Sequence, residues 1–376
     1  MWDNPNRLAK SWKVAYPASG AGRCLGFWTQ TRRESTIKES GAAYLPPAAC
    51  TSASEPMAIN LDKPYRWKAD VIKSVDMYND WFMKFAPVAF RETRTQTTED
   101  VEAALHVTDN LSNIQPVVLK QRPEILPTLR MSTCPPLAVD RLIGLAGVPA
   151  GLVKSMELDK RIPPQMSLAA IDQGLKKIVR IIERMADPDI FIWRSRKDPA
   201  TEAEVHRAAT IVADRLCGAV ANPIIRNAQE KRQLAAIKTW LEAHGYEQLA
   251  ARDGTRFDEM KPGTFSFRMN VPVKLEGGGK TINVPIDAVI MPKGSKAGTL
   301  PLLFEAKSAG DFTNTNKRRK EEAMKMAQLR STYGKKVRFS LFLCGYFDSG
   351  YLGYEAAEGI DWVWEHRIDD LKLFGI

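Results

Sequence analysis

The sequence predicts an α+β fold in which a mixed β-sheet flanked by helices follows a helical N-terminal region. Three observations lead to this prediction. Apolar residues recur at helical spacing through much of residues 57–220. Strand patterns appear only in residues 221–376. In that part the order is helix, three strands, helix and strand, which is typical of a mixed sheet with helices packed against it.

Residues 1–56 differ from the rest of the chain. They are rich in Ala, Gly, Ser and Pro and show no sustained period. Such composition cannot bury enough apolar surface to order a chain. We expect this stretch to be disordered, or to be an extension from an upstream start codon with Met57 as the true beginning.

Residues 57–220 are expected to be helical. The stretch "YRWKADVIKSVDMYNDWFMKFAP" has helical periodicity, and we expect Pro87 to end that helix, with a second helix over residues 97–110. Residues 201–220 also read as a helix. The clearest amphipathic helix has the stripe Leu168, Ile171, Leu175, Ile178, Ile182 and Met185.

Residues 221–376 begin with a helix for which Asn222 is the expected cap, Pro223 the first helical residue and Gly245 the stop. Strands are expected over residues 264–275, 281–291, 299–307 and 336–347, with a basic helix over 316–334 before the last. In the first strand the apolar residues fall on odd numbers, as in a strand with one solvated face: Phe265, Phe267, Met269, Val271, Val273 and Leu275.

The charge balance suggests a polyanionic partner. The formal net charge is +10 and the pI is about 9.3, which favours nucleic acid first and an anionic membrane second. A basic protein that needs only solubility is the alternative. The five cysteines show no C-x-x-C spacing, which argues for a reducing compartment and against a zinc site. Without a signal peptide pattern or an uninterrupted apolar run long enough to cross a bilayer, we expect a cytoplasmic location.

A candidate site lies where two strands carry acids. Glu305 and Lys307 share parity and leave the same face of their strand. If Met291 pairs with Thr299, Asp287 lies diagonal to Glu305, at about 7–8 Å. Two carboxylates at that distance suit Mg²⁺, and a lysine beside them can hold the attacking water. A plain ion pair between Glu305 and Lys307 is the alternative.

Glu230 is a third candidate acid. Helical steps from it reach the apolar stripe Leu234, Ile237 and Leu241, so we expect it to point towards the sheet and to assist the metal site. The alternative is an acid in the first helical turn that interacts with the helix dipole.

The segment after Lys307 is strongly basic. Residues 313–338 hold nine Lys or Arg and two Glu, a net of +7. Because the start of a helix binds phosphate well, we expect DNA contacts there. A solvated basic face is the alternative. The expected DNA-binding residues are Thr313, Asn314, Asn316, Lys317, Arg318 and Arg319.

These residues resemble a known superfamily. Asp287 followed by Glu305-Ala306-Lys307 on consecutive strands resembles the PD-(D/E)XK nucleases, although Pro285 stands two residues before the Asp. The stretch "EAKSAGDFTNTNKRRKEEA" looks like type II restriction endonucleases. "YRWKADVIKSVDMYNDWF" and "LRMSTCPPLAVDRL" are similar to the XamI family, although the acidic run expected after Pro-Pro is missing. The resemblance covers about residues 64–345.

The resemblance implies Mg²⁺-dependent cleavage of double-stranded DNA at a short specific sequence, with 5′-phosphate products. It implies that Asp287 and Glu305 are metal ligands and that Lys307 assists the attacking water. Glu230 corresponds to the acid that many members carry on a helix. Residues 57–220 would then contact DNA or form a dimer surface, and residues 221–376 would be the nuclease core. A homodimer is expected because palindromic sites are read by two-fold symmetric proteins, and a cognate DNA methyltransferase would protect the host.

Two other functions fit the same residues. One is a DNA repair or structure-selective nuclease on the same fold. The other is a non-catalytic DNA-binding protein with an inactive relic core, which would bind DNA in a salt-dependent way without metal-dependent turnover.

Overall fold

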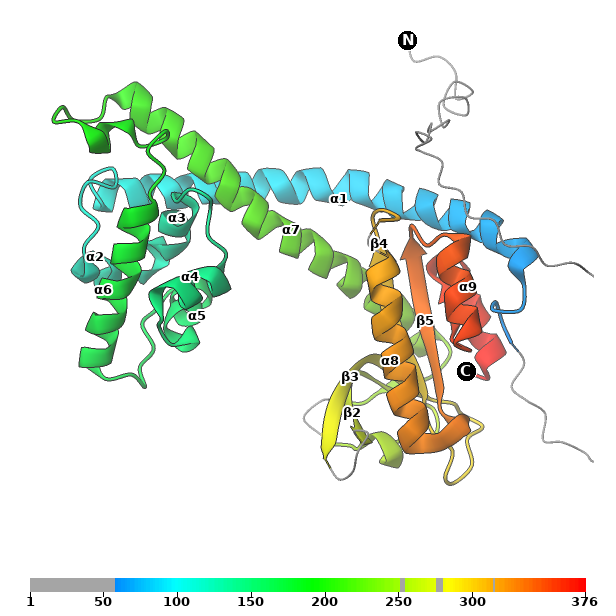
Figure 1. Ribbon diagram of the computed structural model, residues 1–376. Helices are drawn as coiled ribbons and strands as arrows, with labels where there is room; N and C mark the ends of the chain where they lie inside the picture. The colour runs from blue at the N-terminus through cyan, green and yellow to red at the C-terminus, as the bar shows by residue number, and fades with distance from the viewer. Residues whose placement is uncertain (1–57, 251–253, 275–279, 314) are drawn as a thin grey trace, which may run out of the picture. The chain divides into compact units, whose positions relative to one another are not determined.

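The computed structural model describes residues 58–376 apart from 251–253, 275–279 and 314, and it gives no side-chain account of residues 316–318 (Figure 1). The described residues belong to one compact unit. The expectations for residues 1–56 lie outside them. The boundary expected at residue 220 falls inside helix α7, Glu202–Ala243.

In the described part of the chain, six strands form one sheet in chain order. They are β1 (Glu247–Gln248), β2 (Thr264–Lys274), β3 (Thr281–Met291), β4 (Leu302–Ala309), β5 (Arg338–Gly345) and β6 (Asp361–Trp364). β2, β3 and β4 are antiparallel neighbours, whereas β1 pairs with β2, β4 with β5, and β5 with β6 in parallel. The predicted α+β class, with a mixed sheet and flanking helices, is confirmed.

Helices cover both faces of this sheet. Alternate residues of β5 enter different cores: Leu341 and Leu343 pack with helices α8 (Thr315–Tyr333) and α9 (Ser349–Ala357), whereas Phe342 packs with α7. Figure 1 shows α8 and α9 on the viewer's side of β5. The strands β4, β5 and β6 are therefore buried on both sides, which explains their long apolar runs.

The helical part has a core of its own. Its shorter helices are α2 (Pro116–Gln121), α3 (Leu126–Met131), α4 (Val139–Ala146), α5 (Ala150–Leu158) and α6 (Leu168–Met185). Ser167 caps α6, since its hydroxyl accepts a hydrogen bond from the Ala170 N–H at 3.3 Å. The predicted stripe of α6 is buried from Ile171 to Ile182, but Leu168 is 69% exposed because it stands in the first turn, at the edge of the core.

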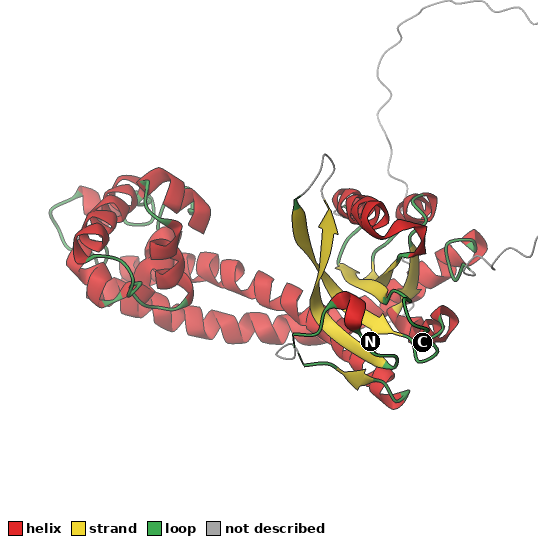
Figure 2. Ribbon diagram, turned by 90° about the horizontal axis from the view of Figure 1, so that it is seen from below, coloured by secondary structure: helices red, strands yellow, loops and turns green. Residues whose placement is uncertain are grey.

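Two helices are longer than expected: the predicted stop at Pro87 and the predicted start at Asn222 and Pro223 are both wrong, whereas the predicted stop at Gly245 agrees with the end of α7 at Ala243. Helix α1 runs from Pro64 to Val107 through Pro87, and α7 runs through Pro223, so Asn222 is no cap. A proline inside a helix costs about 3 kcal/mol. The two helices run side by side (Figures 1 and 2), and their contact offsets that cost. The hydroxyl of Thr97, for example, reaches the backbone oxygen of Ala213 at 3.5 Å.

The composition of α7 bears on the expectation that no uninterrupted apolar run crosses a bilayer. Helix α7 is long enough and apolar enough by composition to cross a bilayer. Side chains along it, including Ala208, Val212 and Leu216, are buried in the helical core instead. The apolar stretch of α7 is 39% buried in all, and core helices of soluble proteins share its composition, so this single helix is weak evidence for a membrane span.

Strand β2 does not have a single solvated face. Phe265 and Phe267 pack into the α7 core, whereas Met269, Val271 and Val273 pack into the α8 core; Leu275 lies outside the described residues. The switch occurs at Arg268, whose φ of +52° is left-handed. That conformation costs a non-glycine residue about 1–2 kcal/mol, and it turns the strand so that residues of one parity cover two cores.

The pairing of β3 with β4 differs by two residues from the one assumed. Ala288 pairs with Phe304, and Val289 with Leu303, so Asp287 is opposite Glu305 rather than diagonal to it. The assumed register took Thr299 into the strand, whereas β4 begins at Leu302. Because a shift of two keeps every side chain on its face, the shared face of Asp287 and Glu305 is retained.

Candidate active site

A cavity of about 300 Å³ opens between the C-terminal half of α7, the middle of β3, the end of β4 and the start of α8. All four predicted residues, three acids and one lysine, line it: Glu230 from α7, Asp287 from β3, and Glu305 and Lys307 from β4. The remaining lining residues are Arg226, Gln229, Gln233, Ala306, Ser308 and Glu321. The fold thus brings together side chains that are up to 77 positions apart in the sequence.

Asp287 is half-buried and is held by the neighbouring strand. Its Oδ2 accepts a hydrogen bond from the backbone N–H of Ala306 at 2.9 Å. Burial, followed by the negative charge of Glu305, raises the pKa of Asp287 to about 6, and the Ala306 bond opposes this rise. Near neutral pH this carboxylate is therefore charged at a cost, which a cation would remove.

Glu305 is almost fully buried and has one oxygen in use. Its Oε1 lies 2.7 Å from Nζ of Lys325 and 3.3 Å from Nζ of Lys307. Its Oε2 is buried without a hydrogen-bond partner in the described structure. A buried carboxylate oxygen without a partner is costly, so this atom is suited to receive a ligand.

Lys307 lies between two carboxylates. Its Nζ is 3.1 Å from Oε1 of Glu322 on α8, in addition to its contact with Glu305. Burial by itself lowers the pKa of Lys307, but the charges of Glu305 and Glu322 outweigh it and raise the net pKa. The side chain is consequently a firmly protonated ammonium that donates hydrogen bonds and does not act as a base at neutral pH.

Glu322 and Lys325 are site residues that the sequence reading missed. That reading treated the segment as a basic surface helix, yet Glu322 is 1% exposed and Lys325 reaches Glu305. A signal was present in the sequence. Met326 and Leu329 are buried apolar residues of α8, and steps of four back from them reach Glu322 and Lys325.

A second buried carboxyl group lies behind Glu322. Glu355 of α9 is 1% exposed. Burial, and then the charge of Glu322, raises the pKa of Glu355 to about 8. Burial also raises the pKa of Glu322, against the effect of Lys307. With a pKa of about 8, Glu355 is mostly protonated at neutral pH, close to the Glu322–Lys307 contact.

Glu230 lies at the cavity but is paired with another residue. Its Oε1 lies 2.6 Å from Nη2 of Arg268, and both side chains are open to solvent. Among the described residues, no group of three or more His, Cys, Asp or Glu side chains is placed to hold a metal ion. Glu230 thus does not join Asp287 and Glu305 in a three-carboxylate cluster, although its charge contributes to the raised pKa of Asp287.

A buried amide ties α7 to the two central strands. Nε2 of Gln233 donates to the backbone oxygens of Lys307, at 3.2 Å, and of Phe342, at 3.1 Å. Gln233 is fully buried. This polar position on an otherwise apolar helix face fixes the distance between Glu230 on α7 and Lys307 on β4.

The residues predicted to contact DNA are described only in part. Asn314 lies outside the described residues, and nothing is known here of the side chains of Asn316, Lys317 and Arg318. Thr313 is exposed. The guanidinium of Arg319 lies 3.7 Å from the ring centre of Tyr354 on α9.

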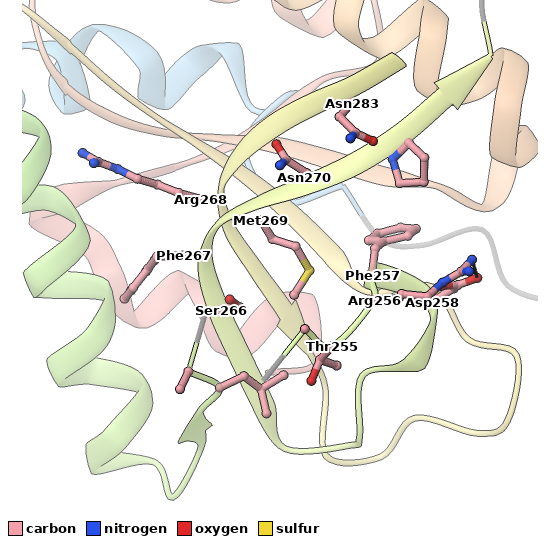
Figure 3. A pocket seen from close by; sticks show the side chains of 14 residues that line it. Thr255, Arg256, Phe257, Asp258, Ser266, Phe267, Arg268, Met269, Asn270 and Asn283 are labelled. Atoms are coloured by element: carbon pink, nitrogen blue, oxygen red, sulfur yellow. Dashed lines mark hydrogen bonds and ion pairs between the residues drawn. The ribbon is translucent and has the colours of Figure 1, made fainter. Parts of the chain in front are cut away.

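A second cavity of about 580 Å³ lies beside β2 (Figure 3). Its floor includes Met269 and Phe257, and the amide side chains of Asn270 and Asn283 face each other at one end. Arg268 belongs to its rim but points away from Met269 and Phe257. The strand that carries Arg268 therefore borders this second cavity, and the Arg268 side chain reaches Glu230, which lines the first.

The donor set at the first cavity fits a divalent cation. Mg²⁺ is usually held by one or two carboxylates together with water and phosphate oxygens. Asp287 has a raised pKa, Glu305 has a free buried oxygen, and the two are opposite each other on adjacent strands. Oxygen ligands of this kind suit magnesium, manganese or calcium better than zinc.

Comparisons with known proteins agree with this chemistry. Residues 109–364 match the XamI restriction endonuclease family. The chain is 53% identical over 317 residues to the type II restriction enzyme SalI of Streptomyces albus G, a match that covers 84% of this chain and 99% of that enzyme. The protein VC1899 of Vibrio cholerae is a structural match over 68% of this chain and 55% of its own, with 12% identity and a TM-score of 0.25, too low to inform the fold.

The chain therefore belongs to the XamI restriction endonuclease family. It is an enzyme of the type II restriction endonuclease class, that is, a site-specific deoxyribonuclease. This result favours the first functional prediction over a repair nuclease or a relic without activity. Both Asp287 and Glu305-Ala306-Lys307 lie within the matched residues.

Proposed function

We propose that the protein is a Mg²⁺-dependent type II restriction endonuclease with a PD-(D/E)XK core. It hydrolyses phosphodiester bonds of double-stranded DNA at a short specific sequence and leaves 5′-phosphates. The observation that carries this proposal is the meeting of Asp287, Glu305 and Lys307 at one cavity, with Glu305 Oε2 left without a partner.

The roles follow from the chemistry of each side chain. Asp287 and Glu305 would hold the cation, which when bound polarises the phosphoryl group and lowers the pKa of a bound water. Lys307 keeps its proton because Glu305 and Glu322 face it. Its ammonium is therefore suited to orient the attacking water and to stabilise negative charge that develops on the phosphate.

The remaining roles rest on position. Glu230 faces the same cavity and would act as a further acid beside Asp287. The start of α8 would bind the DNA backbone through Thr313, Asn314, Asn316, Lys317, Arg318 and Arg319, because this segment is basic and opens a helix. The helical part would add DNA contacts or a dimer surface.

A homodimer is part of this proposal. In the described residues of one chain, Asp287, Glu305 and Lys307 meet at a single cavity. One such cavity can cleave one DNA strand at a time. Two chains related by a two-fold axis would place one cavity on each strand of a palindromic site. Cleavage of host DNA would be prevented by a cognate methyltransferase, as a functional partner.

The test is cleavage of phage DNA by the full-length protein with Mg²⁺, followed by sequencing of the fragment ends. Constant ends with a 5′-phosphate are expected. The variants Asp287→Asn, Glu305→Gln and Lys307→Met should lose cleavage while they still bind a duplex that carries the mapped site, measured with Ca²⁺ in place of Mg²⁺. Glu358→Gln and Lys372→Ala, which change exposed side chains away from the cavity, should cleave normally.

Two results would contradict the proposal. Normal cleavage by Lys307→Met would remove that residue from the chemistry. Random fragment ends would show that the enzyme does not select a sequence. Sedimentation velocity of the protein with and without the duplex would test whether it is a dimer, since a single chain bound to each duplex would exclude a homodimer.

A further inference from the structure

Arg268 combines an unusual backbone with an exposed charged side chain. Its φ of +52° is left-handed although it stands in the middle of β2. Pairing continues in one register on both sides, from Phe267 with Ala288 to Met269 with Ile286. Arg268 is therefore opposite Asp287 in the ladder, at the point where the strand passes from one core to the other.

The turn of the strand does not by itself call for arginine. Glycine adopts a left-handed conformation without strain, and asparagine does so more readily than arginine. A residue that strains the backbone at a functional site is retained when its side chain is needed there. The reason for an arginine at this position therefore lies in the contacts of its side chain.

The guanidinium has a weak partner in the free protein. It pairs with Glu230 at 2.6 Å, but the two side chains are 62% and 36% exposed, and an ion pair between exposed groups adds little stability. Glu230 lines the cavity with Asp287, Glu305 and Lys307. The guanidinium consequently contacts a residue of the candidate active site, although Arg268 itself lines the neighbouring cavity, where its side chain points away from Met269 and Phe257 (Figure 3).

We infer that Arg268 binds a phosphate of the DNA strand that enters the active site, and that Glu230 holds its guanidinium until the DNA arrives. The planar guanidinium donates two parallel hydrogen bonds to a phosphate, which an ammonium does not. A phosphate also competes well for an arginine whose present partner is solvent-exposed. This inference rests on the proposed nuclease function, which supplies the DNA strand at this cavity.

The test uses variants that separate the backbone from the side chain. Arg268→Gly and Arg268→Asn keep the left-handed conformation accessible and remove the guanidinium, so the melting temperature should stay the same or rise. Arg268→Lys keeps the charge without the two-pronged geometry. Arg256→Ala is the matched control, because Arg256 is also exposed and paired with a carboxylate, that of Asp258, across the second cavity.

Binding is measured by fluorescence anisotropy with a labelled duplex that carries the mapped cleavage site, in Ca²⁺ and over a range of KCl concentrations. Arg268→Gly should raise the Kd about tenfold and reduce the slope of log K against log salt by about one, the amount expected for one lost phosphate contact. Arg268→Lys should keep the slope but lose affinity. Arg256→Ala should match the unaltered protein in both respects.

An unchanged Kd and salt slope in Arg268→Gly, in a folded protein, would overturn the inference. A loss of affinity with a melting temperature that also falls sharply would do the same, because it would show a structural role. The nuclease proposal is judged separately by Asp287→Asn: if that variant is inactive while Arg268→Gly binds normally, only the role of Arg268 fails. If Asp287→Asn still cleaves, the nuclease assignment fails whatever Arg268 does.

Discussion

Nζ of Lys307 on β4 lies 3.1 Å from Oε1 of Glu322 on α8, where the Glu322 side chain is buried and that of Lys307 is 17% exposed. The lysine of the candidate active site is thus held by a carboxylate from the helix that follows its strand. Because Glu322 contacts Lys307 but does not itself line the cavity, its effect on catalysis should act through the position and charge of that lysine.

The first prediction concerns this contact. Glu322→Gln keeps the size of the side chain and removes its charge, which leaves Glu305 as the main partner of the Lys307 ammonium. We expect the single-turnover cleavage rate to fall by about 10- to 100-fold, within the range of other positioning effects, while duplex binding in Ca²⁺ stays the same. Glu358→Gln, an exposed change near the end of α9, is the control. An unaltered rate in Glu322→Gln would show that Lys307 does not depend on it.

The second prediction concerns Asp287. Its pKa is raised to about 6, first by burial and then by Glu305, and a cation binds only the deprotonated carboxylate. We expect the cleavage rate at low Mg²⁺ to decline as the pH falls through about 6. Because Mg²⁺ and the proton compete, higher Mg²⁺ should move the midpoint to lower pH. Rate profiles at several Mg²⁺ concentrations measure this, and a midpoint that ignores Mg²⁺ would argue against Asp287 as a ligand.

The third prediction concerns Glu355 and stability. The pKa of Glu355 is raised from 4.5 to about 8, mainly by burial. The folded state therefore retains a proton that the unfolded state loses, and this contribution to the free energy of unfolding is complete below pH 4.5 and is lost as the pH rises through 8. Glu355→Gln stays neutral throughout. It should melt at the same temperature as the unaltered protein near pH 4.5 and at a higher temperature at pH 8.5.

Calorimetry at these two pH values is the measurement for Glu355. The unaltered protein and Glu355→Gln differ only in this side chain, so the buried Tyr351 on α9 is present in both. Equal melting temperatures at pH 8.5 would show that Glu355 titrates normally in the folded protein.

The fourth prediction concerns the helical part. Arg130 and Glu157 form a two-pronged ion pair, at 2.9 and 3.0 Å, in which each side chain is 8% exposed. Glu157→Leu leaves a buried guanidinium without its carboxylate, and we expect a loss of about 3–5 kcal/mol in the free energy of unfolding. The double variant Arg130→Met/Glu157→Leu should recover most of it. Urea titrations of the three proteins measure both effects, and an additive double variant would show that the pair is not coupled.

Much of the sheet and part of the site followed from the sequence. The apolar runs of β3, β4 and β5, the equal parity of Glu305 and Lys307, and the basic character of α8 are all local properties of the chain. The assumed register was wrong by two residues, and a shift of two keeps each side chain on its face of the sheet. Asp287 was therefore still predicted on the same face as Glu305. The full lengths of α1 and α7 could not be read in the same way, since by local rules Pro87 marks the end of a helix and Pro223 the start of one.

The sequence by itself determined which side chains share a face of a strand, such as Glu305 and Lys307, because alternation along a strand is fixed by the geometry of one chain segment. Only the tertiary structure decided which partners those residues contact. Glu322 pairs with Lys307, Glu230 pairs with Arg268, and Gln233 donates hydrogen bonds to the backbones of β4 and β5. The physical reason is that burial, pKa and ion pairing depend on the packing of segments far apart in the chain. No local pattern encodes how closely α7 or α8 approaches the strands of the sheet.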